Sequence, residues 1–329
     1  MQKYKINVNN TNISIEIIIF AKKQSKMVKF SVILPVYNVA QYLDDTFTSL
    51  LNQTLQEIEI ITVNDGSTDN CEEIIKKYVQ KDQRIKYFTQ KNQGQSVARN
   101  FALQHAIGEY IYMMDSDDVL ANLDALRVCY EYAEQNKADF IFFDGDILQE
   151  PGTSHFTWDY KRTEDLEEYK VYQGEKLLSE MLDKWKHNCV VWLLMIRHDY
   201  LKKIGLTFYP GIIHEDELFT TQLTLQSDNI FCLQKSFVKH RVRQASTMGK
   251  TYSKRNLDCY LTVIDELFKF QDSPIIRKFA KYTLSKVFYT GHQIPFRDKF
   301  PVFWRACKSG YLKYIGLKPA LVFWFKKKH

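Results

Sequence analysis

An acidic cluster at the end of an apolar run offers ligands for a divalent metal ion. The segment EYIYMMD ends in Asp115, and Ser116, Asp117 and Asp118 follow directly. An Asp-x-Asp pair at the end of a buried strand brings two carboxylates near one spot, and Mg²⁺ and Mn²⁺ prefer carboxylate oxygens as ligands. The alternative is a helix start capped by aspartate. The spacing alone leaves both interpretations open.

Three earlier apolar runs also end in polar residues. Tyr37-Asn38 follows the first run, Asp65-Gly66-Ser67 the second and Asn92-Gln93-Gly94 the third. Ligands of parallel sheets collect at the carboxyl ends of the strands, so four polar ends in a row favour the metal interpretation of the aspartates. The second end can also be a simple turn into a helix, capped by Thr68 or Asp69.

The elements that position these residues follow from the alternation of residues 29–144. Apolar runs at FSVILPVY, IEIITVND, IKYFTQ, EYIYMMD and ADFIFFD alternate with amphipathic stretches at 42–51, 71–79, 96–106 and 123–134. This pattern predicts an α/β fold with a mostly parallel central sheet and helices on both faces. Residues 145–180 are less regular, and they precede an apolar stretch at 190–196 and the strand-like FVKHRVR.

Composition indicates a globular chain without disulfides. Of the 329 residues, 45% are hydrophobic and 14% aromatic, which is enough to bury a large core. The six cysteines are spread along the chain with no zinc-knuckle or redox spacing, which predicts reduced thiols in the cytoplasm. The apolar stretch at 13–21 is too short to cross a bilayer and lacks a cleavage site, so residues 1–26 are expected to form a flexible leader.

The last part of the chain differs sharply from the rest in charge. Residues 274–329 carry 13 Lys or Arg and 13 aromatic residues against the single acid Asp298, although the whole chain has a net charge of only +6. This composition favours docking to an anionic membrane surface. Packing or oligomerisation is the alternative, and nucleic acid is not expected as a partner because no recognition module accompanies the basic residues.

Five motifs occur in order along the chain: FSVILPVYN, ITVNDGSTD, NQGQSVARN, GEYIYMMDSDD and HEDELF. Together they resemble the family 2 glycosyltransferases of the GT-A fold, inverting enzymes that build bacterial surface polysaccharides. The resemblance covers roughly residues 29–250 and predicts a GT-A domain at 27–250. Its nucleotide-binding half would be 27–120 and its acceptor half 121–250, followed by a helical basic and aromatic region at 251–329.

The resemblance implies a pocket for a UDP-sugar and an Mn²⁺ or Mg²⁺ ion. Within it, Asp65 would read the base, Asp115 would face the ribose and Asp117 would bind the ion, with Asp118 as a supporting carboxylate. Arg241 and Arg243 could clamp the diphosphate through forked hydrogen bonds. The implied nucleotide-sugar residues are Pro35, Val36, Tyr37, Asn38, Asp65, Gly66, Ser67, Arg99, Asn100, Asp115, Ser116, Arg241 and Arg243.

On the acceptor side the resemblance assigns the catalytic base to Asp216, with Glu215 beside it. Without the other motifs, this acidic first turn would be explained by the helix dipole alone. Trp192 matches a family position near the acceptor, but the apolar residues that follow it favour the core. His240 stands where the family often has Tyr, as either a metal ligand or a packed histidine, and packing is slightly favoured.

The expected function is transfer of a hexose or N-acetylhexosamine from a UDP-sugar to a surface or lipid-linked glycan. The work would take place on the cytoplasmic face of the inner membrane, with the enzyme bound peripherally. One rival is a catalytically silent scaffold of the same fold that docks at the membrane in a glycan assembly complex. A sugar nucleotidyltransferase is less consistent with the chain, because PVYN offers no glycine- and arginine-rich phosphate loop.

Overall fold

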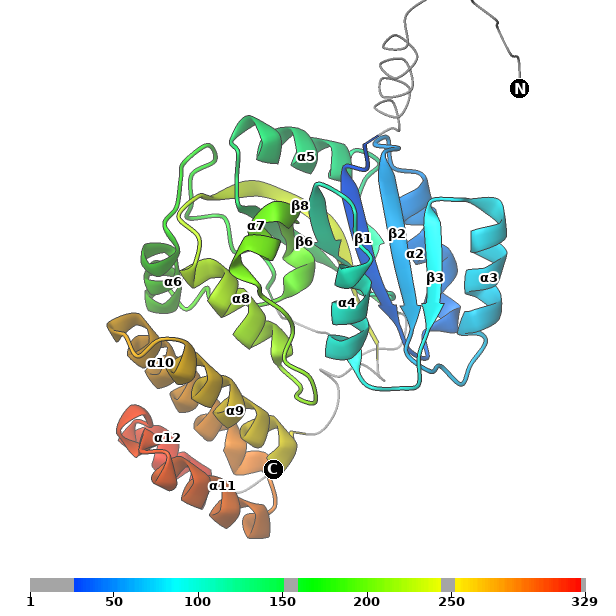
Figure 1. The fold of residues 1–329 in the computed structure, drawn as a ribbon. Coiled ribbons are helices and arrows are strands. Elements are labelled where there is room, and N and C mark those ends of the chain that lie inside the picture. The colour runs from blue at the N-terminus through cyan, green and yellow to red at the C-terminus, as the bar shows by residue number, and fades with distance from the viewer. Residues whose placement is uncertain (1–26, 151–158, 244–251, 327–329) are drawn as a thin grey trace, which may run out of the picture.

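The structure, a computed structural model, describes residues 27–150, 159–243 and 252–326. Their strands form one eight-stranded sheet in the order β3-β2-β1-β4-β7-β6-β8-β5. Four parallel strands make up its first half: β1 (Phe30–Val36), β2 (Ile58–Asn64), β3 (Ile85–Thr89) and β4 (Tyr110–Met113). The mostly parallel sheet expected from the sequence is therefore confirmed, and Figure 1 shows these strands with their carboxyl ends pointing down.

The second half of the sheet is mixed. β7 (Leu194–Arg197) is antiparallel to both β4 and β6 (Phe140–Gln149), whereas β8 (Ile230–Val242) is parallel to β6. The short β5 (Val119–Leu120) is antiparallel to β8, and Val119 pairs with Lys239. This pairing brings the end of β8 beside the acidic cluster that directly precedes β5.

Helices cover both faces, because alternate residues of the central strands point to opposite sides. Phe30, Val32 and Leu34 of β1 belong to one core and Ile33 to the other. The first core is covered by α2 (Ala40–Leu51), α3 (Cys71–Lys81) and α5 (Ala125–Gln135). The second is covered by α4 (Gln95–Gln104), α6 (Gly174–Asp183), α7 (His198–Ile204) and α8 (Glu215–Leu225).

The C-terminal region is helical, as its composition predicted. It consists of α9 (Lys254–Phe270), α10 (Pro274–Thr290), α11 (Phe296–Lys308) and α12 (Leu317–Phe325). Ser253 and Asn256 form a capping box at the start of α9, and Pro274 occupies the first turn of α10, where its missing N–H costs nothing.

This helical region has its own core, which Leu178 and Leu182 of α6 and Leu218 of α8 join. It therefore packs against α6 and α8 of the sheet domain, with α11 and α12 on the outer side (Figure 1). None of the helices in the described parts of the chain is long and apolar enough to span a membrane. The predicted leader at 1–26 lies outside the described residues.

Candidate functional site

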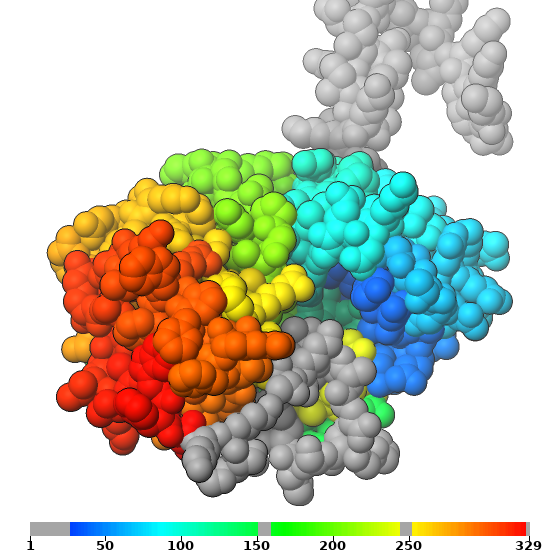
Figure 2. Space-filling view, turned by 90° about the horizontal axis from the view of Figure 1, so that it is seen from below, coloured from blue at the N-terminus to red at the C-terminus, as the bar shows by residue number. Residues whose placement is uncertain are grey.

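The polar strand ends meet at the lower edge of the sheet, as the parallel arrangement requires. Figure 2 looks onto this edge and shows a hollow between the blue and cyan half of the chain and its yellow and orange part. Pro35 and Val36 are buried at the end of β1, whereas the side chain of Tyr37 is 48% exposed. Asn38 follows in a left-handed conformation with φ 52°.

Asp65 organises the loop after β3. Its Oδ1 accepts hydrogen bonds from Gln90 Nε2 at 2.7 Å and from the backbone N–H of Gln93 at 2.8 Å, and its Oδ2 accepts one from Gly94 N–H at 2.8 Å. Gly66 has φ 72°, and a Cβ there would lie 2.8 Å from the backbone N of Asn92. The second and third strand ends are therefore built as one rigid unit, in which only glycine fits at position 66.

Ser67 and Asn38 join the first strand end to the same unit. The backbone N–H of Asn38 donates to Ser67 Oγ at 3.1 Å, and Asn38 Oδ1 accepts from Thr68 N–H at 2.8 Å. Ser67 N–H in turn donates to Asn64 Oδ1 at 2.9 Å. Sequence-predicted pocket residues from three strand ends thus lie together at this edge.

Asp115 and Asp118 converge with His240 at the acidic cluster, and their nearest donor atoms all lie within 4.8 Å of one another. His240 Nδ1 lies 3.0 Å from Asp118 Oδ2, while the backbone N–H of Arg241 donates to Asp118 Oδ1 at 2.8 Å. Thr46 of α2 donates to the carbonyls of Ser116 and Asp118, which fixes the turn itself. Two carboxylates and an imidazole form a donor set that could hold a divalent metal ion.

The electrostatics of this cluster follow from burial. Burial raises the pKa of Asp118 to about 7, against the opposing effect of His240. Burial acts to lower the pKa of His240, but Asp118 outweighs it, so that the pKa rises to about 9. Trp192 stacks on the His240 ring with centroids 4.9 Å apart and 10° between the planes. The imidazole is therefore held in one orientation by both a carboxylate and an indole.

Asp117 has a different partner. Its Oδ2 accepts a hydrogen bond from Arg243 Nε at 2.6 Å, and burial raises its pKa. Asp117 remains a predicted metal ligand, and Arg243 already binds one of its two carboxylate oxygens. The structure brings Arg243 to the acidic cluster, as the phosphate-clamp hypothesis requires.

Arg99 joins the end of β4 to the start of α8. It projects from α4 with its side chain 4% exposed and lies 3.0 Å from both Asp115 Oδ1 and Glu215 Oε1. Its guanidinium also lies over the ring of Phe208, 5.1 Å from the centroid. Through this one cation, the acidic cluster after β4 and the acidic first turn of α8 become parts of a single site.

Asp216 lies directly beside this bridge, in the first turn of α8. Its pKa is raised well above the usual range, first by burial and then by the neighbouring charges of Glu215 and Glu217. Its Oδ1 accepts the backbone N–H of Glu217 at 3.0 Å. A raised pKa makes the ionised carboxylate a stronger proton acceptor than one in water, which is the property that a general base needs.

Three sequence-predicted residues are engaged elsewhere. The Arg241 guanidinium donates to Asp45, Glu150 and the carbonyl of Asp117 and lies over the ring of Tyr42, so it faces α2. Asn100 binds the backbone N–H and C=O of Phe208 with both ends of its amide, each at 2.8 Å. Trp192 is 4% exposed and stacks on His240, which agrees with the core position that its apolar neighbours favour, and its contact with the acceptor stays a prediction.

Two residues near the site were not found from the sequence. Tyr160 is buried, lies edge-on to Trp192 and His240, and has its pKa raised by burial and by Asp118, Asp115 and Asp216. His214 stacks on Tyr260 of α9 at 4.1 Å, and its Nε2 lies 3.2 Å from Asn256 Nδ2. Neither has a spacing signal, because both contacts depend on tertiary packing.

Comparisons with known proteins identify the family of this chain. The model of the family described as "Glycosyl transferase family 2" matches residues 31–205, more than half of the chain. The uncharacterized glycosyltransferase YibD of Escherichia coli is 32% identical over 66% of this chain and 62% of its own length. Glycosyltransferase GlyA of Streptococcus pneumoniae is 31% identical over 72% of this chain, but only 34% of its own length is covered.

Solved structures share the fold. TarS of Staphylococcus aureus (residues 1–349) in complex with UDP-GlcNAc aligns with a TM-score of 0.67 at 20% identity, covering 89% of this chain and 83% of that one. The mannosyltransferase PcManGT of Pyrobaculum calidifontis with GDP-Man and Mn²⁺ aligns with a TM-score of 0.56 at 14% identity, covering 91% and 79%. The described fold is thus the GT-A fold, and the chain belongs to glycosyl transferase family 2.

Proposed function

We propose that this chain is an inverting glycosyltransferase that moves a hexose or N-acetylhexosamine from a UDP-sugar to a hydroxyl group of a surface or lipid-linked glycan. The observation that supports it most directly is the Arg99 bridge. Because Arg99 binds Asp115 and Glu215 at once, the acidic strand ends that suit a nucleotide donor lie beside Asp216, which suits a general base.

In this mechanism Asp216 takes the proton of the acceptor hydroxyl. The acceptor oxygen forms its new bond to the anomeric carbon from the face opposite the nucleotide, which inverts the configuration there. The bond from that carbon to the phosphate oxygen breaks, and its electron pair leaves with the nucleoside diphosphate. Glu215 stays fixed by Arg99 and so keeps the first turn of α8 in place.

Asp115, Asp118 and His240 would hold a divalent ion, with Asp117 as the further predicted ligand. When bound, such an ion neutralises the negative charge that develops on the leaving diphosphate. The carboxylates of this set suit Mn²⁺ or Mg²⁺. The complexes of TarS with UDP-GlcNAc and of PcManGT with GDP-Man and Mn²⁺ support a nucleotide-sugar donor, and the TarS complex favours UDP.

We further propose that residues 27–120 form the donor half, 121–250 the acceptor half, and 251–329 a membrane-docking region. The support for docking is a surface that we call the aromatic face. It combines one side of α11 with one side of α12, and its side chains are between 49% and 78% exposed. Its members are Phe296, Phe300, Trp304, Leu317, Leu321 and Phe325.

The residues of the aromatic face recur every fourth position on each helix, so each set forms a single stripe. Trp324 joins the two stripes, since its ring contacts Phe296 and Phe300 with centroids 6.0 and 4.9 Å apart. Five exposed cations lie on α11 and α12, between them or directly after them in the sequence: Arg297, Lys308, Lys313, Lys318 and Lys326.

An anionic lipid surface fits this combination best. Aromatic and aliphatic side chains enter the headgroup boundary while Lys and Arg contact the lipid charges. A second copy of the same basic face would instead bring like charges together. Docking of this kind would hold the enzyme at the cytoplasmic face of the membrane, next to lipid-linked acceptors.

The proposed donor chemistry is tested by measuring nucleotide release from a panel of UDP- and GDP-sugars, with and without Mn²⁺ and with a lipid-linked glycan extract. We expect release from a UDP-sugar that needs the ion, and NMR of the product should show the inverted anomer. Asp117→Asn should weaken the response to Mn²⁺, whereas Asp124→Asn, at the N-cap of α5, should not. Donor binding without release across the whole panel would instead identify a silent scaffold.

A further inference from the structure

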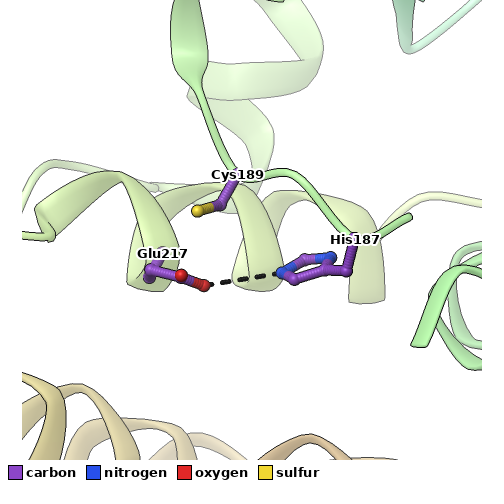
Figure 3. Close-up of side chains that lie close together, drawn as sticks. All are labelled: His187, Cys189 and Glu217. Atoms are coloured by element: carbon purple, nitrogen blue, oxygen red, sulfur yellow. Dashed lines mark ion pairs between the residues drawn. The ribbon is translucent and has the colours of Figure 1, made fainter. Parts of the chain in front are cut away.

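A second cluster of metal-binding residues lies behind the first turn of α8. His187 and Cys189 come from the segment between α6 and the short 3-10 helix Val191–Leu193, and Glu217 is the third residue of α8. Figure 3 shows the imidazole, the thiol and the carboxylate pointing into one space. One donor atom from each residue lies within 4.8 Å of the other two.

The polar atoms of this cluster are buried and poorly satisfied. The side chains of His187 and Glu217 are only 7% and 11% exposed, and His187 Nε2 lies 3.5 Å from Glu217 Oε2. At this separation an N–H···O contact is too long for a good hydrogen bond. Both atoms are buried without a hydrogen-bond partner among the described residues. A buried polar atom in this state is destabilising, so a ligand that binds both atoms would relieve that cost.

The helical region closes this space. Phe279 and Tyr282 of α10 lie edge-on to the His187 ring, with centroids 5.4 and 6.3 Å away. The positive charge of Lys286 in α10 acts to lower the pKa of both Cys189 and Glu217. An ammonium group near the carboxylate is therefore the alternative partner that an experiment has to distinguish from a metal ion.

We propose that His187, Cys189 and Glu217 bind one Zn²⁺ ion. Thiolate and imidazole donors select zinc, whereas Mg²⁺ and Mn²⁺ prefer sites made of oxygen. Tetrahedral zinc with bonds of about 2.0 to 2.3 Å holds its donors roughly 3.3 to 3.8 Å apart, so the present spacing needs each donor to move by less than about 1 Å. Three protein ligands leave the fourth position for water.

The ion would tie the segment around Cys189 to the start of α8, directly after Asp216. This role does not depend on the proposed transfer reaction, because the ligands are a different set from Asp115, Asp118 and His240. The same chain would then hold two metals of different chemistry on the two sides of one helix turn.

Cobalt substitution of the full chain tests the proposal, because Co²⁺ bound to a thiolate gives an intense near-ultraviolet band that oxygen ligands do not give. We expect this band in the wild-type protein at one equivalent of Co²⁺, and its displacement by one equivalent of Zn²⁺. Cys189→Ser should abolish it, while Cys307→Ser, at an exposed cysteine of α11, should keep it. A band that survives Cys189→Ser, or that disappears with Cys307→Ser, would overturn the assignment.

Competition with a chromophoric chelator then measures zinc affinity. His187→Ala and Glu217→Gln should each weaken it at least about tenfold, and Lys286→Met should leave it equal or tighter because a competing cation is removed. If zinc binds more weakly to Lys286→Met than to the wild type, the proposal fails. Should Cys189→Ser not fold, the wild-type spectrum still decides, since the lack of a thiolate band rules the site out.

Discussion

Charged residues are used in opposite ways at the carboxyl edge of the sheet and at the aromatic face of α11 and α12. At the sheet edge the charges are buried and paired, as in the contacts of Arg99 with Asp115 and Glu215 and of Arg243 with Asp117. Around the aromatic face the cations are exposed, and Asp298 is the one acid of residues 274–329.

This difference indicates that the two regions have different functions. Buried charges that are already paired hold side chains in fixed positions, which is what a reaction site needs. Exposed cations around apolar side chains create a positive electrostatic potential at the surface, which attracts a negatively charged partner surface. If the two regions act separately, changes at the sheet edge should affect transfer but not docking, and changes at the aromatic face should do the reverse.

The largest effect is expected at the proposed base. Asp216→Asn keeps the shape of the side chain but removes its ability to accept a proton, so the turnover rate should fall about 10³-fold. Nucleotide release in the presence of acceptor measures this, and vesicle binding should stay unchanged. The exposed Asp199→Asn in the first turn of α7 is the control. A loss of less than tenfold for Asp216→Asn would remove the residue from the mechanism.

The second largest effect is expected from Arg99→Met, which should lower the stability of the protein. Removing the guanidinium leaves two carboxylates facing each other in a buried site, which should lower the free energy of unfolding by about 3 kcal/mol. Arg127→Met is a matched control, because Arg127 also binds two acids, Asp124 and Glu131, but is 41% exposed. Its loss should cost much less stability than the loss of Arg99. Urea titration measures both. If both variants lose the same free energy of unfolding, the contacts of Arg99 do not stabilise the packing of α8 against the end of β4.

The sequence predicted the sheet edge well, because its information is local. Polar residues at the ends of apolar runs must meet wherever the strands are parallel, so Asp65 and Asp115 could be assigned to one edge from their places in the alternating pattern. The Arg99 bridge could not be predicted, since Arg99 and Glu215 are 116 residues apart and meet only when α4 and α8 pack on the same face. For the same reason the engagement of Arg241 by α2 was missed.

The sequence showed only that residues 274–329 are rich in aromatic and basic residues, and it did not show which of them form the aromatic face. The run Phe323-Trp324-Phe325 looks uniform in the sequence, yet Phe323 is fully buried and Phe325 is 78% exposed. Which side of each helix faces outward is decided by packing against α10, and neither basic nor aromatic residue counts contain that information. The cluster of His187, Cys189 and Glu217 escaped notice because its ligands come from separate elements without a metal-binding spacing.

Replacing two aromatic residues tests whether the aromatic face docks to a membrane. Phe300→Ser combined with Trp304→Ser should lower the partition onto vesicles containing phosphatidylglycerol about 30-fold, if each ring contributes about 1 kcal/mol at the headgroup boundary. The control combines Ile107→Ser with Leu123→Ser, two exposed apolar residues of the sheet domain. Transfer to a water-soluble acceptor should be unchanged. If the variant instead converts a dimer to a monomer, the face binds a second copy and not lipid.

The smallest effect is expected from a single cation, and it distinguishes a lipid surface from a merely apolar one. Lys318→Gln on α12 should weaken binding to anionic vesicles about fivefold, since each cation near such a surface contributes about 1 kcal/mol. Lys77→Gln, an exposed site on α3, should have no effect. The fivefold difference should vanish on neutral vesicles and shrink at high salt, because ions screen exposed charges over a short distance. A loss that is equal on neutral and anionic vesicles would show that Lys318 packs against the aromatic face, and that the cations do not select the membrane.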